Sequence, residues 1–66
     1  MQILVNGEAF EADDAITLAQ LTEQLGLGGK RIAIELNLDI IPRSEHAATR
    51  LKADDRVEIV HAIGGG

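Results

Sequence analysis

The sequence predicts one α+β domain in which a single helix packs on one face of a mixed sheet of four to five strands. Three observations lead to this prediction: an Asn-Gly pair between two short strand-like runs, a capping-box sequence opening an amphipathic segment, and alternating apolar residues near the C-terminus. A chain of 66 residues leaves no room for a second hydrophobic core. The predicted order is strand, strand, helix, strand, short strand, strand.

The first two strands are predicted at residues 2–5 and 8–11, on either side of Asn6-Gly7. An Asn-Gly pair favours a two-residue type I′ turn, because both central positions of that turn need a positive φ. The two strands should therefore form an antiparallel hairpin.

The helix is predicted to begin after Thr17, which would act as its N-cap. Thr17 and Gln20 have the spacing of a capping box, in which each side chain bonds the backbone N–H of the other residue. Leu21 and Leu25 follow at helical spacing, and Gly26 supplies the left-handed residue that commonly ends a helix. The helix should be short and amphipathic.

The remaining elements are short and are separated by polar turns. Because Pro42 lacks the N–H that a central ladder needs, the strand that ends before it belongs at an edge of the sheet. The predicted elements are a strand at 32–36, a turn at 37–39, a brief strand at 40–41, one helical turn at 44–48, a turn at 53–55 and a last strand at 56–61.

The composition excludes several classes of protein. Six basic and eleven acidic side chains give a formal charge of −5, and Phe10 is the one aromatic residue, so nucleic-acid binding is not expected. There is no cysteine, which excludes a thiol nucleophile. No basic segment precedes a long apolar run, and no run has the length of a membrane span, so we expect a cytoplasmic protein without membrane partners.

The most informative segment is 62–66, in which three glycines end the chain. We predict a domain of residues 1–61 that carries 62–66 as a flexible C-terminal tail. From His61, five extended residues reach about 17 Å, and glycines fit a narrow channel because they lack Cβ. The group that such a tail can deliver is the carboxylate of Gly66, which is ionised at neutral pH. The residues expected to enter a partner's channel are Ile63, Gly64, Gly65 and Gly66.

A carboxylate must be activated before it can act as an acyl donor. Attack of the Gly66 carboxylate on the α-phosphate of ATP would give an acyl-adenylate, which a sulfur, amine or thiol nucleophile could open. The sequence has no glycine-rich phosphate loop between a strand and a helix, so ATP is expected to bind a partner enzyme. No bound cofactor, metal or catalytic side chain is predicted in this chain.

Other polar clusters receive structural interpretations. His46 and His61 are 15 residues apart with no cysteine between them, so both are interpreted as surface histidines rather than zinc ligands. The acidic pairs at 13–14 and 54–55 lie in turn-like stretches, where aspartates bond nearby backbone groups. The segment 28–31 does not have the spacing of a P-loop and is interpreted as a solvated loop.

Alternation along the strands also predicts a docking face. If Ile3 and Val57 point toward the helix, Leu4 and Val60 point away from it, on the open face of the sheet. Apolar residues on an open face indicate a surface that binds a partner, and scattered surface apolar residues are the alternative. We therefore predict that Leu4 and Val60 contact the partner enzymes.

Several short pieces of the sequence occur together in one known family. They are Val5-Asn6-Gly7-Glu8, Thr17-Leu18, the run 32–37, Ile41-Pro42-Arg43-Ser44, the run 57–60 and Gly65-Gly66. With these pieces in this order, the sequence resembles the sulfur-carrier family of thiamine biosynthesis, ThiS, along nearly its whole length. Two departures concern packing and turn geometry: His46 stands where the family often has an aromatic residue, and 53–55 replaces a turn that usually ends in Gly-Asp.

The resemblance implies a β-grasp (ubiquitin-like) fold, with the first and last strands parallel and adjacent at the centre of the sheet. It also implies a cycle. A ubiquitin-activating (E1-like) adenylyltransferase of the ThiF type would adenylate Gly66, a persulfide sulfur would convert it to a thiocarboxylate, and a thiazole synthase of the ThiG type would take the sulfur. The chain would be a protein co-substrate, monomeric when free, and its partners would use the ATP and the sulfur donor.

Three other functions fit parts of the sequence. The small subunit of molybdopterin synthase is also a β-grasp protein with a terminal glycine pair, though it usually has a longer chain and more aromatic residues. A ubiquitin-like protein modifier would end in an isopeptide bond to lysine. A non-carrier β-grasp binding module would make no use of the glycines, so deletion of Gly66 would leave its function intact.

Overall fold

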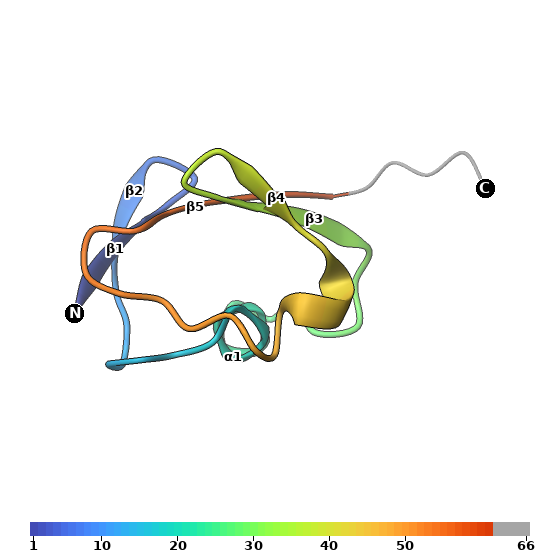
Figure 1. Ribbon diagram of the computed structural model, residues 1–66, viewed down its shortest axis with the longest axis horizontal. Helices are drawn as coiled ribbons and strands as arrows, with labels where there is room; N and C mark the ends of the chain where they lie inside the picture. The colour runs from blue at the N-terminus through green and yellow to red at the C-terminus, as the bar shows by residue number, and fades with distance from the viewer. Residues whose placement is uncertain (62–66) are drawn as a thin grey trace.

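The computed structural model describes residues 1–61 and shows a mixed sheet with one helix packed on one face (Figure 1). This arrangement confirms the predicted α+β class and the predicted order of elements. The strands are β1 (Gln2–Val5), β2 (Glu8–Glu11), β3 (Ile32–Leu36), β4 (Asp39–Ile41) and β5 (Arg56–His61), the helix is α1 (Leu18–Gln24), and a short 3-10 helix, η1, covers Arg43–Glu45.

The five strands lie in the order β2-β1-β5-β3-β4, which places β5 at the centre of the sheet. β1 and β5 run parallel and pair through Leu4 with Arg56 and Val5 with Val57. The other neighbouring strands are antiparallel. The first and last strands are therefore parallel neighbours, which is the β-grasp arrangement that the resemblance implied.

The hairpin and the helix form for the local reasons that the sequence indicates. Asn6 and Gly7 have φ angles of 51° and 82°, as a type I′ turn requires. The Thr17 side chain accepts a hydrogen bond from Gln20 N–H at 3.1 Å, and the Gln20 side chain accepts one from Thr17 N–H at 2.9 Å. The capping box is thus complete, and Gly26, with a φ of 75°, follows the end of the helix as predicted.

The connection between β3 and β4 is tighter than the sequence predicts. Asn37 and Leu38 both have a positive φ, 51° and 75°, so the turn needs two residues and Asp39 already belongs to β4. Asparagine tolerates the left-handed region, whereas a leucine there is uncommon. Pro42 follows β4, which is an edge strand as predicted, and η1 begins at Arg43 rather than at residue 44.

A single hydrophobic core lies between the sheet and α1. Its members come from the helix, from the three central strands and from the segments that connect these elements, so burial of the core fixes α1 against the sheet. Each such side chain stabilises the fold by about 1.5 to 3 kcal/mol through its burial. The large side chains that are less than 2% exposed are Ile3, Leu18, Leu21, Ile34 and Val57.

The interpretation of His46 as a surface residue is wrong. His46 is only 7% exposed, and its Nε2 lies 2.9 Å from the carbonyl oxygen of Ile41. η1 turns the chain from β4 toward α1, where Ala19 N–H donates a hydrogen bond to the His46 carbonyl at 3.1 Å. The imidazole therefore fills space beside the core, a role that an aromatic side chain can share. His61 is exposed, as predicted.

Candidate functional site

The chain reaches residue 61 on a strand that is supported on both sides. β5 lies between β1 and β3, and its last pair joins His61 to Ile32 of β3. On the other side, the Asn6 side-chain oxygen accepts a hydrogen bond from Ile59 N–H at 2.7 Å, which continues the support of β5 past the end of β1. β5 therefore gives any segment that follows His61 a fixed point of origin.

The residues predicted to react or to enter a partner's channel follow that point. Ile63, Gly64, Gly65 and Gly66 lie outside the described residues, as does the whole predicted tail. Their roles, and the flexibility of the segment, stay predictions.

Leu4 and Val60 both lie on the open face of the sheet, but they do not form one cluster. Leu4 is partly exposed and pairs with Arg56, whereas Val60 is 58% exposed and pairs with Ala33. Val60 is four residues beyond Arg56 on β5, which separates it from Leu4 by about 13 Å along the strand. The docking role of both residues stays a prediction.

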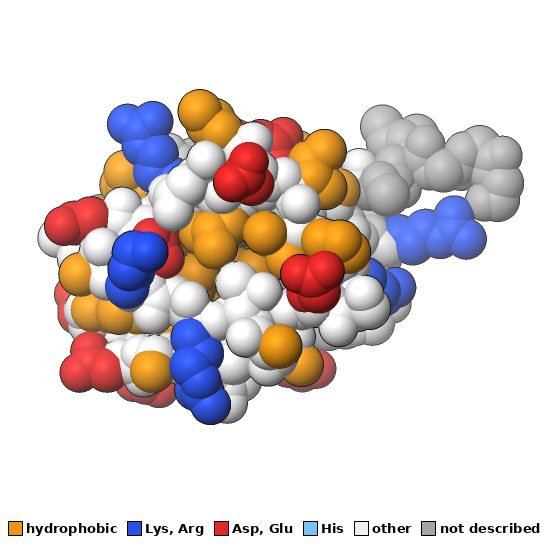
Figure 2. Space-filling view, viewed as in Figure 1, with side chains coloured by type: hydrophobic (Ala, Val, Ile, Leu, Met, Phe, Trp, Pro, Cys, Tyr) orange, Lys and Arg blue, Asp and Glu red, His pale blue; other side chains and the backbone are white. Residues whose placement is uncertain are grey.

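Two apolar residues that the sequence reasoning did not select are more exposed than Val60. Ile40 of β4 is 75% exposed and pairs with Glu35 on the open face, and Leu38, in the β3–β4 turn, is 78% exposed. Figure 2 shows hydrophobic side chains along the upper surface, on the side of the sheet away from α1. No local pattern marks these two residues, because their exposure depends on the strand order and on the open face of the sheet being uncovered.

The acidic pairs are not arranged as catalytic groups. Asp55 is buried, and its two carboxylate oxygens accept hydrogen bonds from Lys52 N–H at 2.9 Å and from the Asn37 side chain at 3.1 Å. It therefore ties the turn before β5 to the β3–β4 turn, as the structural interpretation of this pair expects. In the described part of the chain, no group of histidine and acidic side chains is placed to hold a metal ion.

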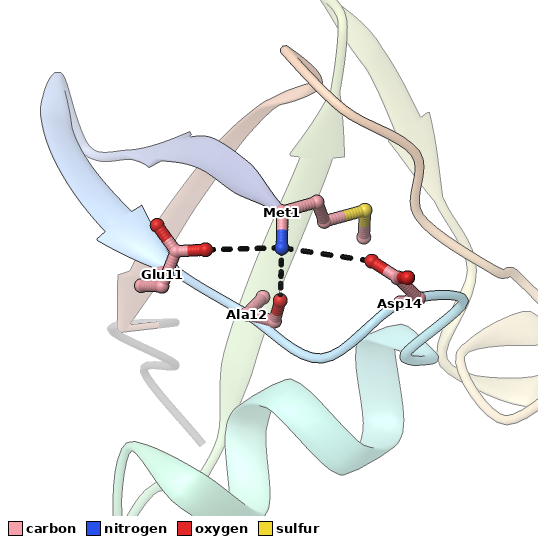
Figure 3. Close-up of polar contacts among 4 residues, drawn as sticks. All are labelled: Met1, Glu11, Ala12 and Asp14. Carbon is pink, nitrogen blue, oxygen red and sulfur yellow. Dashed lines mark hydrogen bonds and ion pairs between the residues drawn. The ribbon is translucent and has the colours of Figure 1, made fainter.

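The N-terminal ammonium forms a cluster of polar contacts (Figure 3). The Met1 nitrogen lies 3.0 Å from Glu11 Oε2 and 3.6 Å from Asp14 Oδ1, and it donates a hydrogen bond to the Ala12 carbonyl at 2.7 Å. The hydrogen bond to Glu11 raises the pKa of the amine above its ordinary value of 8.0. Figure 1 places Met1 at the opposite end of the sheet from the end of β5, so this cluster fastens the fold at a distance from the end of β5.

The sequence matches the model of the ThiS family over residues 3–66. The chain belongs to the ThiS family. This membership confirms the family resemblance that the sequence indicated. Across residues 1–61, no helix has the length and apolar character needed to cross a membrane.

Individual relatives and a solved structure support the membership of this chain in the ThiS family. It is 32% identical to the sulfur carrier protein ThiS of Escherichia coli, over the full length of both. The crystal structure of the thiamine biosynthesis protein ThiS from Geobacter metallireducens superposes with a TM-score of 0.87 at 29% identity, covering all of both chains. The chain is also 36% identical to a thiazole synthase of Paramagnetospirillum magneticum, but it spans only 20% of that protein's length.

Proposed function

We propose that this ThiS-family chain is a sulfur carrier of thiamine biosynthesis and that the carboxylate of Gly66 is its reacting group. The observation that carries the proposal is the extent of the family match, which continues through the glycines to Gly66. The Escherichia coli sulfur carrier protein aligns with all 66 residues, the glycines included, which supports the proposal.

The proposed chemistry begins with activation. The Gly66 carboxylate attacks the α-phosphate of ATP, pyrophosphate leaves, and an acyl-adenylate results. A persulfide then displaces AMP, and cleavage of the S–S bond by a thiol leaves a thiocarboxylate on Gly66. When this sulfur passes to its acceptor the C–S bond breaks, and an oxygen from water or from the acceptor takes its place, which returns the chain to its carboxylate form. In this scheme the chain binds no cofactor, and its partners bind the ATP and the sulfur donor.

Two partners complete the proposal: an adenylyltransferase of the ThiF type and a thiazole synthase of the ThiG type. The second has support in the thiazole synthase of Paramagnetospirillum magneticum, a fifth of which matches this chain. We propose that the carrier is a cytoplasmic monomer between its encounters with these enzymes.

The described fold suits such a carrier. A radius of gyration of 11.2 Å makes the body too wide to enter another protein's active site. The supported end of β5 is the point from which Ile63, Gly64, Gly65 and Gly66 would extend into a partner's channel. Leu4 and Val60, on the open face, are the proposed contacts to the partner's outer surface.

The position of the terminal carboxylate provides the test. Deleting Gly66 leaves a glycine pair at the end but withdraws the carboxylate by about 3.4 Å, and adding one alanine after Gly66 advances it by the same amount. Both changes should lower thiazole formation about 100-fold or more in a reconstituted reaction with the two enzymes, because small misplacements of reacting groups carry losses of this size. Lys52→Ala, in the segment that precedes β5, is the control and should keep full activity.

A chain that supports thiazole formation equally well with and without Gly66 would contradict the proposal. Such a result would favour the non-carrier binding module, in which the glycines have no role. A stable adduct between the carrier and a lysine, formed in place of a thiocarboxylate, would favour a protein modifier.

A further inference from the structure

The part of the open face that β3, β4 and β5 form exposes large apolar side chains. Ile40 and Val60 on this face are 75% and 58% exposed, and Leu38, in the β3–β4 turn at its end, is 78% exposed. Ile40 and Val60 face away from α1, because their cross-strand partners Glu35 and Ala33 do. An apolar patch with polar residues among it is typical of a surface that binds another protein.

The turn residue Leu38 adds a conformational cost. Its φ of 75° lies in the left-handed region, where the second residue of an Asn-Gly turn would be glycine, as Gly7 is in the first hairpin. Leucine at this position disfavours the folded backbone and leaves an apolar side chain in water. A contact with another protein would bury the side chain, and this gain in binding would account for a leucine kept here at a cost in stability.

Like charges lie at the centre of the same surface. Glu35 and Glu58 are direct cross-strand partners on β3 and β5, and both are exposed. Side chains in such a pair have Cβ atoms about 5 Å apart, and like charges there destabilise the sheet. Arg56, two residues along β5, forms no ion pair with either carboxylate among residues 1–61.

The surroundings of this pair define what could bind there. Ile40, Glu35 and Glu58 form one row across β4, β3 and β5. On the other side of Glu58, a hollow of about 240 Å³ is lined by Leu4, Gly7, Arg56, Val57 and Glu58. A cation that binds between two carboxylates with apolar residues around them removes their repulsion and makes charge-assisted hydrogen bonds to both. The planar guanidinium of arginine suits this arrangement.

We propose that this surface, made of Glu35, Leu38, Ile40, Glu58 and Val60, docks on thiazole synthase, and that thiazole synthase presents an arginine or lysine between Glu35 and Glu58 with apolar side chains around it. The inference rests on the proposed function and names the contact chemistry that the partner must supply. Charge complementarity requires a cationic group on the partner, since an acidic one would add to the repulsion already present. Thiazole synthase is the chosen partner because the thiazole synthase of Paramagnetospirillum magneticum includes a segment that matches this chain.

The test uses the full chain and the thiazole synthase of the same genome. Binding is measured by titration calorimetry for the unchanged chain, for Glu35→Gln and Glu58→Gln, and for Glu45→Gln. Glu45 lies in η1, away from this surface, so its variant removes the same unit of charge and serves as the matched control. Thermal unfolding and the thiocarboxylate formed on Gly66 are measured on the same four proteins.

The proposal predicts opposite effects on binding and on stability. Glu35→Gln and Glu58→Gln should each bind about tenfold more weakly. Each should also raise the Tm by about 1 to 4 °C, because the repulsion across the sheet is gone. Glu45→Gln should change neither quantity. Leu38→Gly should behave like the two glutamine variants, with a higher Tm and weaker binding.

Two results would overturn the proposal. One is binding of the Glu35→Gln and Glu58→Gln proteins as tight as that of Glu45→Gln. The other is an effect of these variants confined to the adenylating enzyme, which would make that enzyme the occupant of the surface. In either case, if sulfur is still added to Gly66 at the normal rate, the proposed carrier function is retained. If the chain without substitutions forms no thiocarboxylate, the proposed function itself is refuted.

Discussion

The two faces of the sheet differ in how far their side chains are buried and in how their charges are arranged. The face toward α1 supplies Ile3, Ile34 and Val57, which are almost completely buried. The opposite face leaves Ile40 and Val60 in water and sets two glutamates against each other across β3 and β5. The covered face buries its apolar side chains almost completely, whereas several residues of the open face lower the stability of the domain.

If the open face docks on a partner as proposed, this difference separates the residues that stabilise the fold from those that bind. A core of this size rarely supplies more than roughly 3 to 5 kcal/mol of stability, so unfavourable features on the open face are a large fraction of the total. Features of this kind persist in natural proteins mainly at functional sites. The covered face should therefore control the free energy of unfolding, and the open face should control binding.

The largest expected effect is on the covered face. Leu21→Ala removes a completely buried side chain of α1 and should lower the free energy of unfolding by about 2 to 5 kcal/mol, which approaches the whole stability of the domain. Urea unfolding measures it, with Ile40→Ala as the control on the open face. Equal losses for the two variants would remove the distinction between the faces.

The next effect should appear in binding. Val60→Glu places a third carboxylate beside Glu35 and Glu58, and it should weaken binding to thiazole synthase about tenfold or more. The free energy of unfolding should change by no more than about 1 kcal/mol, because Val60 is mostly exposed in the free domain. Calorimetric titration and urea unfolding of one preparation give both values, and intact binding would argue against a docking role for this residue.

A smaller effect is expected where α1 begins. Thr17→Ala removes the side chain that caps the helix and should lower the free energy of unfolding by about 1 kcal/mol. Thr17→Ser keeps the acceptor oxygen and should lose much less. If both variants are equally destabilised, the capping hydrogen bond is not the reason for the loss.

The smallest effect concerns the fastening of β1. Because Glu11 raises the pKa of the Met1 amine in the folded state, the contribution of this ammonium is fully present below pH 8.0 and is lost as the pH rises through the raised pKa. The free energy of unfolding of a chain that begins at Met1 should therefore decline above pH 8. Glu11→Gln should flatten this decline, and an identical pH profile for both proteins would exclude the contact as its cause.

Local chemistry explains which parts of the fold the sequence could predict. The first hairpin depends on the φ preferences of two adjacent residues, and the start of α1 depends on two side chains three residues apart. The edge position of β4 followed from the missing N–H of Pro42. Each of these features is decided within a few residues, so the pattern is sufficient.

Features that depend on contacts between distant segments could not be predicted from the sequence. His46 is buried because η1 brings it against α1, and no residue near it in sequence reveals that contact. The hydrogen bond from Ile59 N–H to Asn6 joins residues 53 positions apart. The open face was predicted from alternation, but the prominence of Ile40 and the opposition of Glu35 to Glu58 need the strand order and register.

The central claim is that the carboxyl group of Gly66 carries the sulfur. Intact-mass measurement of the full chain, after incubation with ATP, the persulfide donor and the adenylyltransferase, tests it most directly, with fragmentation to locate the change. The account predicts a mass increase equal to the replacement of one oxygen by one sulfur, located at Gly66, and a return to the original mass after thiazole synthase is added. An unchanged mass, or sulfur at any other residue, would contradict it.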